Sequence, residues 1–368
     1  MQNQRLALAR STTDRAATRR SDPGLLFALA ADPDTRILLV DARGRVSLAQ
    51  PAVHPDLPDD GLAPPRAPGA QDVWEGTGHA ASRLPDISAA ALDMTGLTTL
   101  YLGCEHEACG QEGAQWLAVV VPPALEVPEA AAEPTSGADA EGAAEQHPDL
   151  RELLETHPLS ALRAVGAGLS DRDAGLATAA TALASWHARS AHCPACGGTT
   201  LITESGWARL CPQPTGCGAT HFPRTDPAVI VAARDQDDRL LLVHDAAWAE
   251  RRYSVVAGFV EAGETVEAAV AREVAEETGL TVTDVEYVAS QPWPFPRSLM
   301  LGYRAHLEPG DQAARPDGLE VTGALMVSRD ELAQAVAERR IILPGPTSIG
   351  RLLIEDWYGG PIPAPPAS

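Results

Sequence analysis

The stretch GFVEAGETVEAAVAREVAEETGL at residues 258–280 determines more about this chain than any other segment. Its apolar residues Val266, Val270 and Val274 recur at helical spacing, and Gly279 is a natural helix stop. On such a helix, three carboxylates share one face: Glu273, Glu276 and Glu277. Because unpaired like charges repel, this face predicts a bound hard cation such as Mg2+ or Mn2+, which clustered carboxylate oxygens prefer.

A solvated acidic face on an ordinary surface helix would explain E-x-x-E-E alone. The surrounding residues, however, match G-x5-E-x7-R-E-V-x-E-E-x-G-L at every fixed position, and this pattern is the Nudix box. The chain therefore resembles Nudix hydrolases. The resemblance implies an α/β/α sandwich in which strand, loop and helix hold a diphosphate linked to another group. Within the box, Arg272 is expected to orient the carboxylates and Glu264 to brace the loop.

Composition excludes several classes of protein. The formal charge is −22 and lysine is absent, which argues against a general nucleic-acid-binding surface. The chain has no apolar run long enough for a membrane span. The first 20 residues contain five arginines but no apolar core of a signal peptide, so we expect a disordered start over residues 1–20. Six cysteines in a chain of this length fit a reducing cytoplasm.

The remaining domain organisation follows from changes in composition. Short apolar runs between turns predict a mostly β amino-terminal domain over residues 21–121. Residues 122–148 have the composition of an acidic linker, and residues 149–190 show two helical segments. Strand-like and helical patterns mix over residues 223–360, which predicts an α/β domain before a tail at 361–368.

Four cysteines between the helical segments and the α/β domain have the spacing of a zinc ribbon. A C-x2-C knuckle is followed by a wider second pair, in which five residues separate the cysteines: Cys193, Cys196, Cys211 and Cys217. A four-cysteine site leaves no open coordination position, so the zinc expected at residues 191–222 would be structural. The alternative is a ribbon-shaped fold with free thiols.

Residues 290–298 read SQPWPFPRS, in which three prolines alternate with two aromatic residues. Such a segment cannot form a regular helix or an interior strand, so it predicts a stiff loop. The loop would present Trp293 and Phe295 in fixed directions, as a flat ring ligand requires. The alternative is a loop that covers a hydrophobic core.

The cysteine ribbon, the box and this segment together resemble the NADH pyrophosphatase (NAD diphosphatase) family, over about residues 150–358. The resemblance implies hydrolysis of the pyrophosphate of NADH or NAD+ to AMP and nicotinamide mononucleotide. It also implies a homodimer, and NAD-capped RNA as a second candidate substrate because the same bond is broken. Two other functions stay open, namely hydrolysis of another nucleoside diphosphate-linked substrate and non-catalytic nucleotide sensing.

The resemblance also assigns residues. Metal would be held by Glu273, Glu277, Glu320 and the carbonyl of Ala257, with Glu276 as a base or a further ligand. Glu320 enters because it begins a segment similar to a family motif that carries an acid. Substrate contacts are implied for Arg163, Phe222, Gln291, Pro292, Trp293, Pro294, Phe295, Pro296, Arg297, Ser298 and Gly350.

Overall fold

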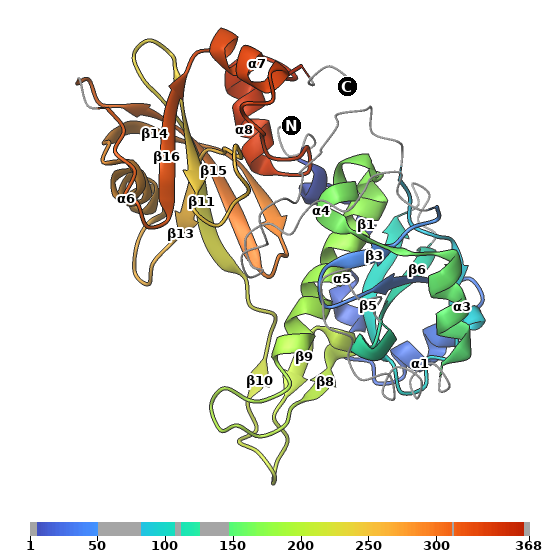
Figure 1. The fold of residues 1–368 in the computed structure, drawn as a ribbon. Helices are drawn as coiled ribbons and strands as arrows, with labels where there is room; N and C mark the ends of the chain where they lie inside the picture. The colour runs from blue at the N-terminus through green and yellow to red at the C-terminus, as the bar shows by residue number, and fades with distance from the viewer. Residues whose placement is uncertain (1–5, 51–81, 107–111, 126–146, 311–312, 364–368) are drawn as a thin grey trace.

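A computed structural model describes residues 6–50, 82–106, 112–125, 147–310 and 313–363. Within these residues the strands form three sheets of seven, three and six members. Figure 1 shows the largest sheet on one side, the NUDIX-box helix and its sheet on the other, and the small three-stranded sheet projecting below them. The structure is thus a mixed α/β fold with several sheets, as the sequence predicts.

The amino-terminal sheet has the strand order β1-β5-β6-β2-β3-β7, with β4 paired to β2. Its strands are Thr13–Asp14 (β1), Arg36–Val40 (β2), Arg45–Ser47 (β3), Ile87–Ser88 (β4), Thr98–His106 (β5), Glu112–Val120 (β6) and Leu159–Ala161 (β7). The sequence pattern indicated only helix around β7. The structure places this short strand between two helices, because its backbone pairs with β3 at the sheet edge.

Helices cover both faces of this sheet. Along β2, Leu38 and Val40 pack toward α5 (Asp171–Arg189), while Ile37 and Leu39 face the opposite core. That second core is closed by α1 (Leu25–Ala30) and α3 (Pro148–Thr156). The near-continuous apolar run in β2 follows from burial on both sides. The short helix α4 (Leu162–Val165) links β7 to α5.

The start of the chain differs from the disorder expected of it. Residues 7–9 form a short 3-10 helix (η2), and Thr13–Asp14 is a strand of the first sheet. Leu6 is 1% exposed in a core of the carboxyl-terminal domain, and Leu8 is 2% exposed in the core beside α5. The described part of this segment therefore contributes to two cores. Burial of its leucines orders the segment, although its arginines favour disorder in a composition-based interpretation.

The small sheet contains β8 (Leu201–Thr203), β9 (Ala208–Leu210) and β10 (Thr220–His221). The 3-10 helix η7 (Glu204–Gly206) connects the first two strands. All three strands are antiparallel, and Thr220 pairs with Leu210. This is the region in which the sequence predicts a ribbon.

The carboxyl-terminal sheet has the order β14-β15-β11-β12-β16, and β13 pairs with β11. Its strands are Asp226–Arg234 (β11), Leu240–Asp245 (β12), Val256–Phe259 (β13), Val282–Trp293 (β14), Ser298–Leu307 (β15) and Val321–Val327 (β16). Alternate residues of β11 pack on opposite faces. Val229 and Val231 face α6 (Val266–Thr278), whereas Ile230 and Ala232 face α8 (Ile349–Tyr358).

The helix α7 (Arg329–Ala337) also lies on the α8 side, and it begins at a capping box formed by Ser328 and Glu331. One sheet thus lies between α6 and the pair α7 and α8, which is the α/β/α sandwich that the Nudix resemblance implies. The prediction of this fold is confirmed. The box loop and the start of α6 lie at the end of the sheet where β13 finishes.

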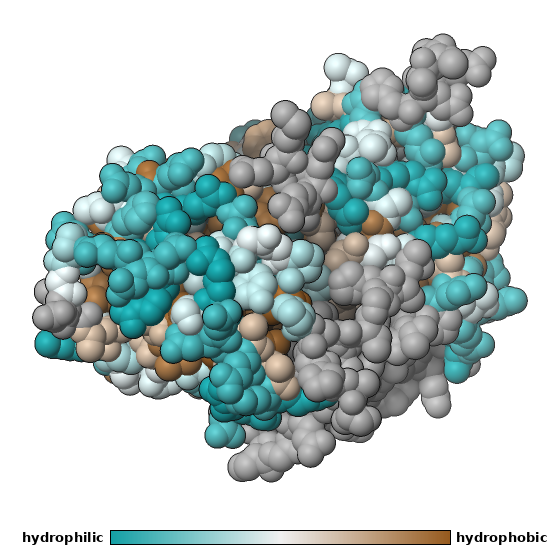
Figure 2. Space-filling model, turned by 90° about the horizontal axis from the view of Figure 1, so that it is seen from above, coloured by the Kyte–Doolittle hydropathy of each residue, from teal (hydrophilic) through white to brown (hydrophobic). Residues whose placement is uncertain are grey.

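Surface features are ordinary on the face shown in Figure 2. The described residues there are mostly hydrophilic, and hydrophobic residues occur in small scattered groups. Among the described residues, no helix combines the length and the apolar character needed to cross a membrane.

Candidate active site

Helix α6 places the box carboxylates as its sequence predicts. Its amino terminus is capped by Thr265, whose hydroxyl accepts from the Ala268 N–H, and it ends at Gly279. Val270 and Val274 are fully buried against the sheet. Because Glu273 and Glu277 lie next to these valines on the helix, they are also buried, whereas the side chain of Glu276 is 59% exposed.

Gly258 makes room for one of these carboxylates. A Cβ atom at this position would lie 2.0 Å from the carboxyl carbon of Glu273 and within 2.2 Å of both of its oxygens. No side chain fits there without moving Glu273. Gly258 therefore allows β13 and the carboxylate to approach closely, which the sequence spacing alone could not explain.

Arg272 holds the loop and the helix together. Its guanidinium makes two parallel hydrogen bonds to Glu264 at 2.8 and 2.9 Å, and it donates to Glu273 and Glu276 at 2.9 Å each. It also donates to the carbonyl of Phe259. The bond from Arg272 is the main reason that the pKa of Glu264 falls to about 2. These contacts agree with the bracing and orienting roles expected of Glu264 and Arg272.

Glu277 lies in a different environment. It is 6% exposed and, within the described part of the chain, has no hydrogen bond or ion pair. Burial raises its pKa to about 8, and the negative charges of Glu273 and Glu320 add to that shift. Burial also raises the pKa of Glu273, although Arg272 opposes that change. Burial is costly only for the ionised carboxylate, so a bound cation would stabilise the ionised form of Glu277.

The acidic group is wider than the sequence indicated. The field at Glu277 also comes from Asp245, at the end of β12, and from Asp317, before β16. Asp317 accepts the backbone N–H groups of Leu319, Glu320 and Val321, and so shapes the turn that carries Glu320. Sequence reasoning missed both aspartates because neither belongs to the box. Asp245 ends a largely apolar strand, which was the available signal for it, whereas Asp317 lies in no pattern that points to it.

The residues fit a divalent cation by their chemistry. The set offers hard carboxylate oxygens from α6 and from the turn before β16, and Ala257, an exposed residue of β13, directly precedes Gly258. Glu320 itself is exposed. Among the described residues, however, only the cysteine group brings three or more ligand atoms within 4.8 Å of one another. The carboxylates surround a site without converging as tightly.

The four predicted cysteines do converge. Their sulfur atoms lie within 4.8 Å of one another, with Cys193 and Cys217 3.7 Å apart and Cys196 and Cys211 3.5 Å apart. A zinc ion 2.3 Å from four tetrahedral thiolates would hold the sulfurs about 3.8 Å apart. The hydrogen bond from Gly198 leads the effects that lower the pKa of Cys196 to about 6. The wide spacing before Cys217 is therefore compatible with a metal site.

The aromatic segment corrects an expectation. Strand β14 continues through Trp293, and only residues 294–297 form the turn to β15. Pro292 is tolerated because β14 is an edge strand. The rings of Trp293 and Phe295 pack edge to face, 5.0 Å apart, and both are packed against the core beside α5. This packing accords with a segment that covers a core, and both rings are half-buried.

The amino-terminal domain is shaped to receive Phe295. A Cβ atom on Gly44 would lie 2.8 Å from the Phe295 ring, so this close approach depends on glycine. On the other side, Ser185 of α5 donates to the carbonyl of Pro296 at 3.2 Å. Two large apolar rings gain more from this burial than from exposure to solvent.

The other predicted substrate residues lie in separate places. Gln291 is completely buried and donates to the carbonyl of Thr347, just before α8. Gly350 is buried in the first turn of α8, and Arg163 is half-buried in α4. Phe222 is 67% exposed beside the ribbon. Arg297 pairs with Asp226. Pro294, Pro296 and Ser298 lie in and beside the turn before β15.

One exposed aromatic residue was missed. Phe259 directly follows Gly258 at the end of β13, and its side chain is 58% exposed. It lies beside the box loop, since its carbonyl accepts from Arg272. An apolar residue at an x position of the box pattern carries no signal in one sequence, so only the structure draws attention to this ring.

Comparison with known proteins agrees with this geometry. The NUDIX domain profile matches residues 224–344, so the chain carries a NUDIX domain. It is 44% identical over 204 residues to the NAD-capped RNA hydrolase NudC of Mycobacterium bovis (strain BCG / Pasteur 1173P2), a match that covers 53% of this chain and 64% of the relative. It is 35% identical over 198 residues to the human NAD-capped RNA hydrolase NUDT12, covering 51% and 42%.

The narrower resemblance, to NudC-like Nudix proteins, is thereby confirmed as well. The match spans less than two thirds of the length of either relative. Among solved structures, a NUDIX hydrolase from Nitrosomonas europaea matches at 27% identity with a TM-score of 0.34, covering 48% of this chain and 96% of that one.

Proposed function

We propose that the protein is a metal-dependent Nudix hydrolase that splits the pyrophosphate bond of NADH or NAD+ into AMP and nicotinamide mononucleotide. The observation that carries this proposal is the buried carboxylate of Glu277, whose pKa is raised by burial and by the charges of Glu273 and Glu320 and which no basic side chain of the described residues pairs with. An anionic diphosphate cannot bind beside such a cluster unless cations intervene. Mg2+ or Mn2+ held by Glu273, Glu277, Glu320 and the Ala257 carbonyl would neutralise phosphoryl charge and activate water when bound.

The protein's own side chains hold the metal-binding carboxylates in position. Arg272 keeps Glu273 directed over Gly258, and Glu264 anchors Arg272 through a bidentate pair. Glu276 is exposed next to them, where it can accept a proton or extend the ligand set. The ring of Phe259 offers a flat exposed surface beside the box loop. In-line attack on a diphosphate requires this kind of fixed geometry more than covalent chemistry.

For residues 291–298 we propose an indirect part in substrate binding. Trp293 and Phe295 anchor the segment to the amino-terminal domain, and Gln291 ties it to the loop before α8. Arg297, Ser298 and the proline carbonyls are then presented by a rigid turn. Arg163, Phe222 and Gly350 stay candidate substrate contacts, as the family resemblance implies.

NAD-capped RNA is the second candidate substrate. The relatives at 44% and 35% identity are named NAD-capped RNA hydrolases, and the bond to be broken is the same as in NAD+. We further propose a homodimer, because the candidate substrate contacts of a single chain lie apart and a second copy would bring a further set. Sedimentation or light scattering would test this state.

The cysteine cluster is proposed to hold structural zinc, since the four sulfurs leave no open position for substrate. The domain boundaries implied by the sequence are retained as proposals, with residues 191–222 as the ribbon and 223–360 as the Nudix domain. The first sheet, over residues 21–121 with β1 and β7 added, is proposed as a separate packing unit.

The substrate proposal is tested by mass-spectrometric analysis of products formed from NADH with Mn2+. AMP and reduced nicotinamide mononucleotide are the expected products. Purified Glu277→Gln protein serves as the control against contaminating hydrolases. If no AMP forms while a sugar nucleotide or a dinucleoside polyphosphate is cleaved well, the NAD(H) assignment is wrong and the protein serves another Nudix substrate. Tight nucleotide binding without turnover of any of these compounds would support the sensor alternative.

A further inference from the structure

His221 ends the last strand of the ribbon and reaches the cysteine cluster, although it is not one of the four cysteines. Its imidazole Nε2 lies 3.2 Å from the sulfur of Cys193, so one of these atoms donates a hydrogen bond to the other. Within the described residues, the group whose ligand atoms all lie within 4.8 Å of one another contains the four sulfurs and not His221. The imidazole therefore lies beside the cluster, in contact with one of its sulfurs.

The direction of this hydrogen bond follows from the ionisation of Cys193. A cysteine that binds a metal does so as the thiolate, which has no proton to donate. The imidazole N–H must then be the donor and the sulfur the acceptor. Because hydrogen bonds to an ionised acceptor are the stronger ones, the contact strengthens when the sulfur carries its charge.

Cys193 depends on a side chain for such a bond. The residue is 2% exposed, so water has almost no access to its sulfur. The sulfur of Cys211, by contrast, accepts from the backbone N–H of Cys217 at 3.4 Å. In the described part of the chain, no backbone N–H donates to the Cys193 sulfur, and the half-buried imidazole of His221 supplies the donor instead.

The charge of the cluster gives this donor a physical role. Four thiolates around Zn2+ carry about two net negative charges, and this chain of formal charge −22 has no lysine to offset them. Arg209, which pairs with His221 across β9 and β10, is buried, but its guanidinium is hydrogen-bonded to Thr200 and His187. Among the described side chains, His221 is thus the one whose N–H reaches a sulfur of the cluster.

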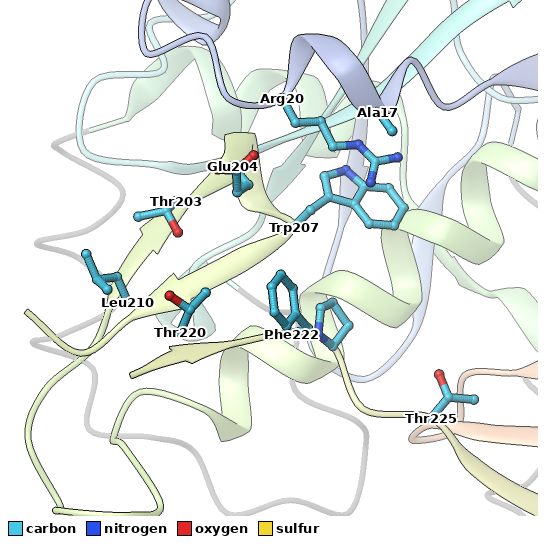
Figure 3. A pocket seen from close by; sticks show the side chains of 10 residues that line it. Ala17, Arg20, Thr203, Glu204, Trp207, Leu210, Thr220, Phe222 and Thr225 are labelled. Atoms are coloured by element: carbon cyan, nitrogen blue, oxygen red, sulfur yellow. The ribbon is translucent and has the colours of Figure 1, made fainter. Parts of the chain in front are cut away.

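The same bond joins the two ends of the ribbon. Cys193 belongs to the first knuckle, and His221 follows it by 28 residues. Strand β10 is only two residues long, and Thr220 and His221 pair with Leu210 and Arg209 of β9. Figure 3, which looks into a pocket beside the small sheet, shows Thr220 and Leu210 on these neighbouring strands. So short an edge strand gains from a second attachment, which the contact with the Cys193 sulfur provides.

In a rival arrangement His221 would itself be a metal ligand and would replace Cys217. Cys217 is exposed, and five residues separate it from Cys211. Its sulfur nevertheless lies 3.7 Å from that of Cys193, close to the distance of about 3.8 Å between two thiolates on one zinc ion. The geometry therefore favours four sulfur ligands, with His221 outside them.

We propose that His221 is a positioning residue of the cysteine site, whose imidazole N–H donates to the Cys193 thiolate and so slows loss of the metal. The inference rests on the structural zinc proposed above. A donor of this kind stabilises the ionised ligand and fixes its direction. Loss of a residue that supports a metal ligand in this way typically lowers metal affinity about 10- to 100-fold.

The experiment measures the zinc affinity of full-length variants by competition with a chromophoric chelator. We expect His221→Phe, which keeps a ring but has no donor, to bind zinc about tenfold more weakly than the wild type. His221→Gln places an amide N–H near the former Nε2 and should recover most of this affinity. The control is His192→Phe, because His192 is next to Cys193 in the sequence but exposed. Its affinity should stay within about twofold of the wild type.

Cobalt substitution distinguishes a supporting donor from a ligand. The absorption of Co2+ bound to cysteines depends on the number and kind of its ligands, so the spectra of the wild type and His221→Phe should be superimposable. Thermal unfolding with added zinc verifies the fold, and His221→Ala serves the same purpose if the larger Phe ring disrupts the ribbon. NADH hydrolysis at saturating zinc and Mn2+ should change by less than about twofold.

Three results would overturn the role of His221 alone. These are an unchanged zinc affinity of His221→Phe, an altered cobalt spectrum, which would make His221 a ligand, and an equal loss of affinity in His221→Gln and His221→Phe. A wild-type protein that binds neither zinc nor cobalt would overturn the proposal together with the zinc site. Hydrolysis of NADH with Mn2+ still tests the proposed activity in that case.

Discussion

The box helix and the aromatic segment are the two most distinctive motifs of this chain, and the fold uses them differently. On α6 the carboxylates lie where helical spacing puts them, and Gly258 leaves room for that of Glu273. In the segment that ends β14, Trp293 and Phe295 pack on the core of the amino-terminal domain. A motif of charged residues on one helix fixes its own geometry, whereas large apolar rings settle wherever tertiary structure buries them.

The largest effect, a loss of activity, is expected from a change in the box helix α6. Glu277→Gln removes a buried charge that the cation site needs, while the amide keeps the side-chain volume. Changes in residues that only support a metal ligand cost about 10- to 100-fold, so we expect NADH hydrolysis to fall on the order of 10³-fold. Steady-state kinetics with Mn2+ measures it, and circular dichroism verifies the fold.

The matched control is Glu267→Gln, on the same helix but exposed and outside the acid group. Its rate should stay within about twofold of the wild type. A Glu277→Gln protein that retains the full rate would show that the buried carboxylate holds no catalytic cation. The proposal that the box helix holds the catalytic cation would then be wrong.

The aromatic side of the comparison predicts a loss of stability instead of activity. Phe295→Ala empties the space above Gly44 in the amino-terminal core, which should cost about 2–3 kcal/mol of the free energy of unfolding. Activity per folded molecule on NADH should be nearly unchanged at low temperature. Urea unfolding and steady-state kinetics measure the two quantities. Phe27→Ala, at a position 84% exposed, is the control with no expected loss.

A loss of substrate affinity without a loss of stability would instead indicate that the Phe295 ring contacts the substrate. If Phe295→Ala raised the KM for NADH several-fold with unchanged stability, the ring would have to reach the ligand in the working enzyme. The close contact at Gly44 sharpens this test, since Gly44→Ala should cost less stability in the Phe295→Ala protein than in the wild type. Equal costs would contradict the packing described above.

The sequence predicted the sandwich and the box helix because both depend on local periodicity and on a long, specific pattern. It also predicted the cysteine group, since sulfur ligands tolerate the loop that separates Cys211 from Cys217. It could not predict Asp245 or Asp317, which approach Glu277 only when three distant segments meet. Nor could it decide between an exposed and a buried Phe295, because that depends on a glycine in another domain.

Contacts between distant segments also explain why the described part of residues 1–20 is ordered, although the composition predicts disorder there. Arginine, serine and threonine favour disorder in a composition-based interpretation, but burial of Leu6 and Leu8 depends on two cores formed much later in the sequence. Arg15 and Arg20, which lie between these leucines and the first helix, are then placed over the ring of Trp207. Tertiary contacts override local composition where a segment joins two domains.

A pH dependence of stability should separate the buried acid from its exposed neighbours. The pKa of Glu277 is raised to about 8 in the folded protein, against an ordinary value of 4.5. The folded state therefore holds a proton that the unfolded state has lost between these values. The wild type should lose stability as the pH rises through this window and level off above pH 8. Glu277→Gln lacks this loss.

Melting temperatures of the two proteins, in buffers freed of added divalent cations but without chelator, test this directly. We expect similar values at pH 5 and a more stable Glu277→Gln protein at pH 9, by a few kcal/mol at most. Saturating Mn2+ should reverse the order at pH 9, since the cation binds the ionised carboxylate. A difference that is constant with pH would mean that Glu277 titrates normally and is not desolvated.

The smallest effect is expected at a residue that only shapes the site. Asp317 accepts the N–H groups of Leu319, Glu320 and Val321, so Asp317→Ala should loosen the turn that carries Glu320. We expect the Mn2+ concentration for half-maximal rate to rise about three- to tenfold, with the rate largely restored at saturating metal. Asp317→Asn keeps an acceptor, so its Mn2+ concentration for half-maximal rate should lie between those of the wild type and Asp317→Ala. An equal loss at low and saturating Mn2+ would contradict a positioning role, because a defect in holding the cation must diminish as the cation concentration rises.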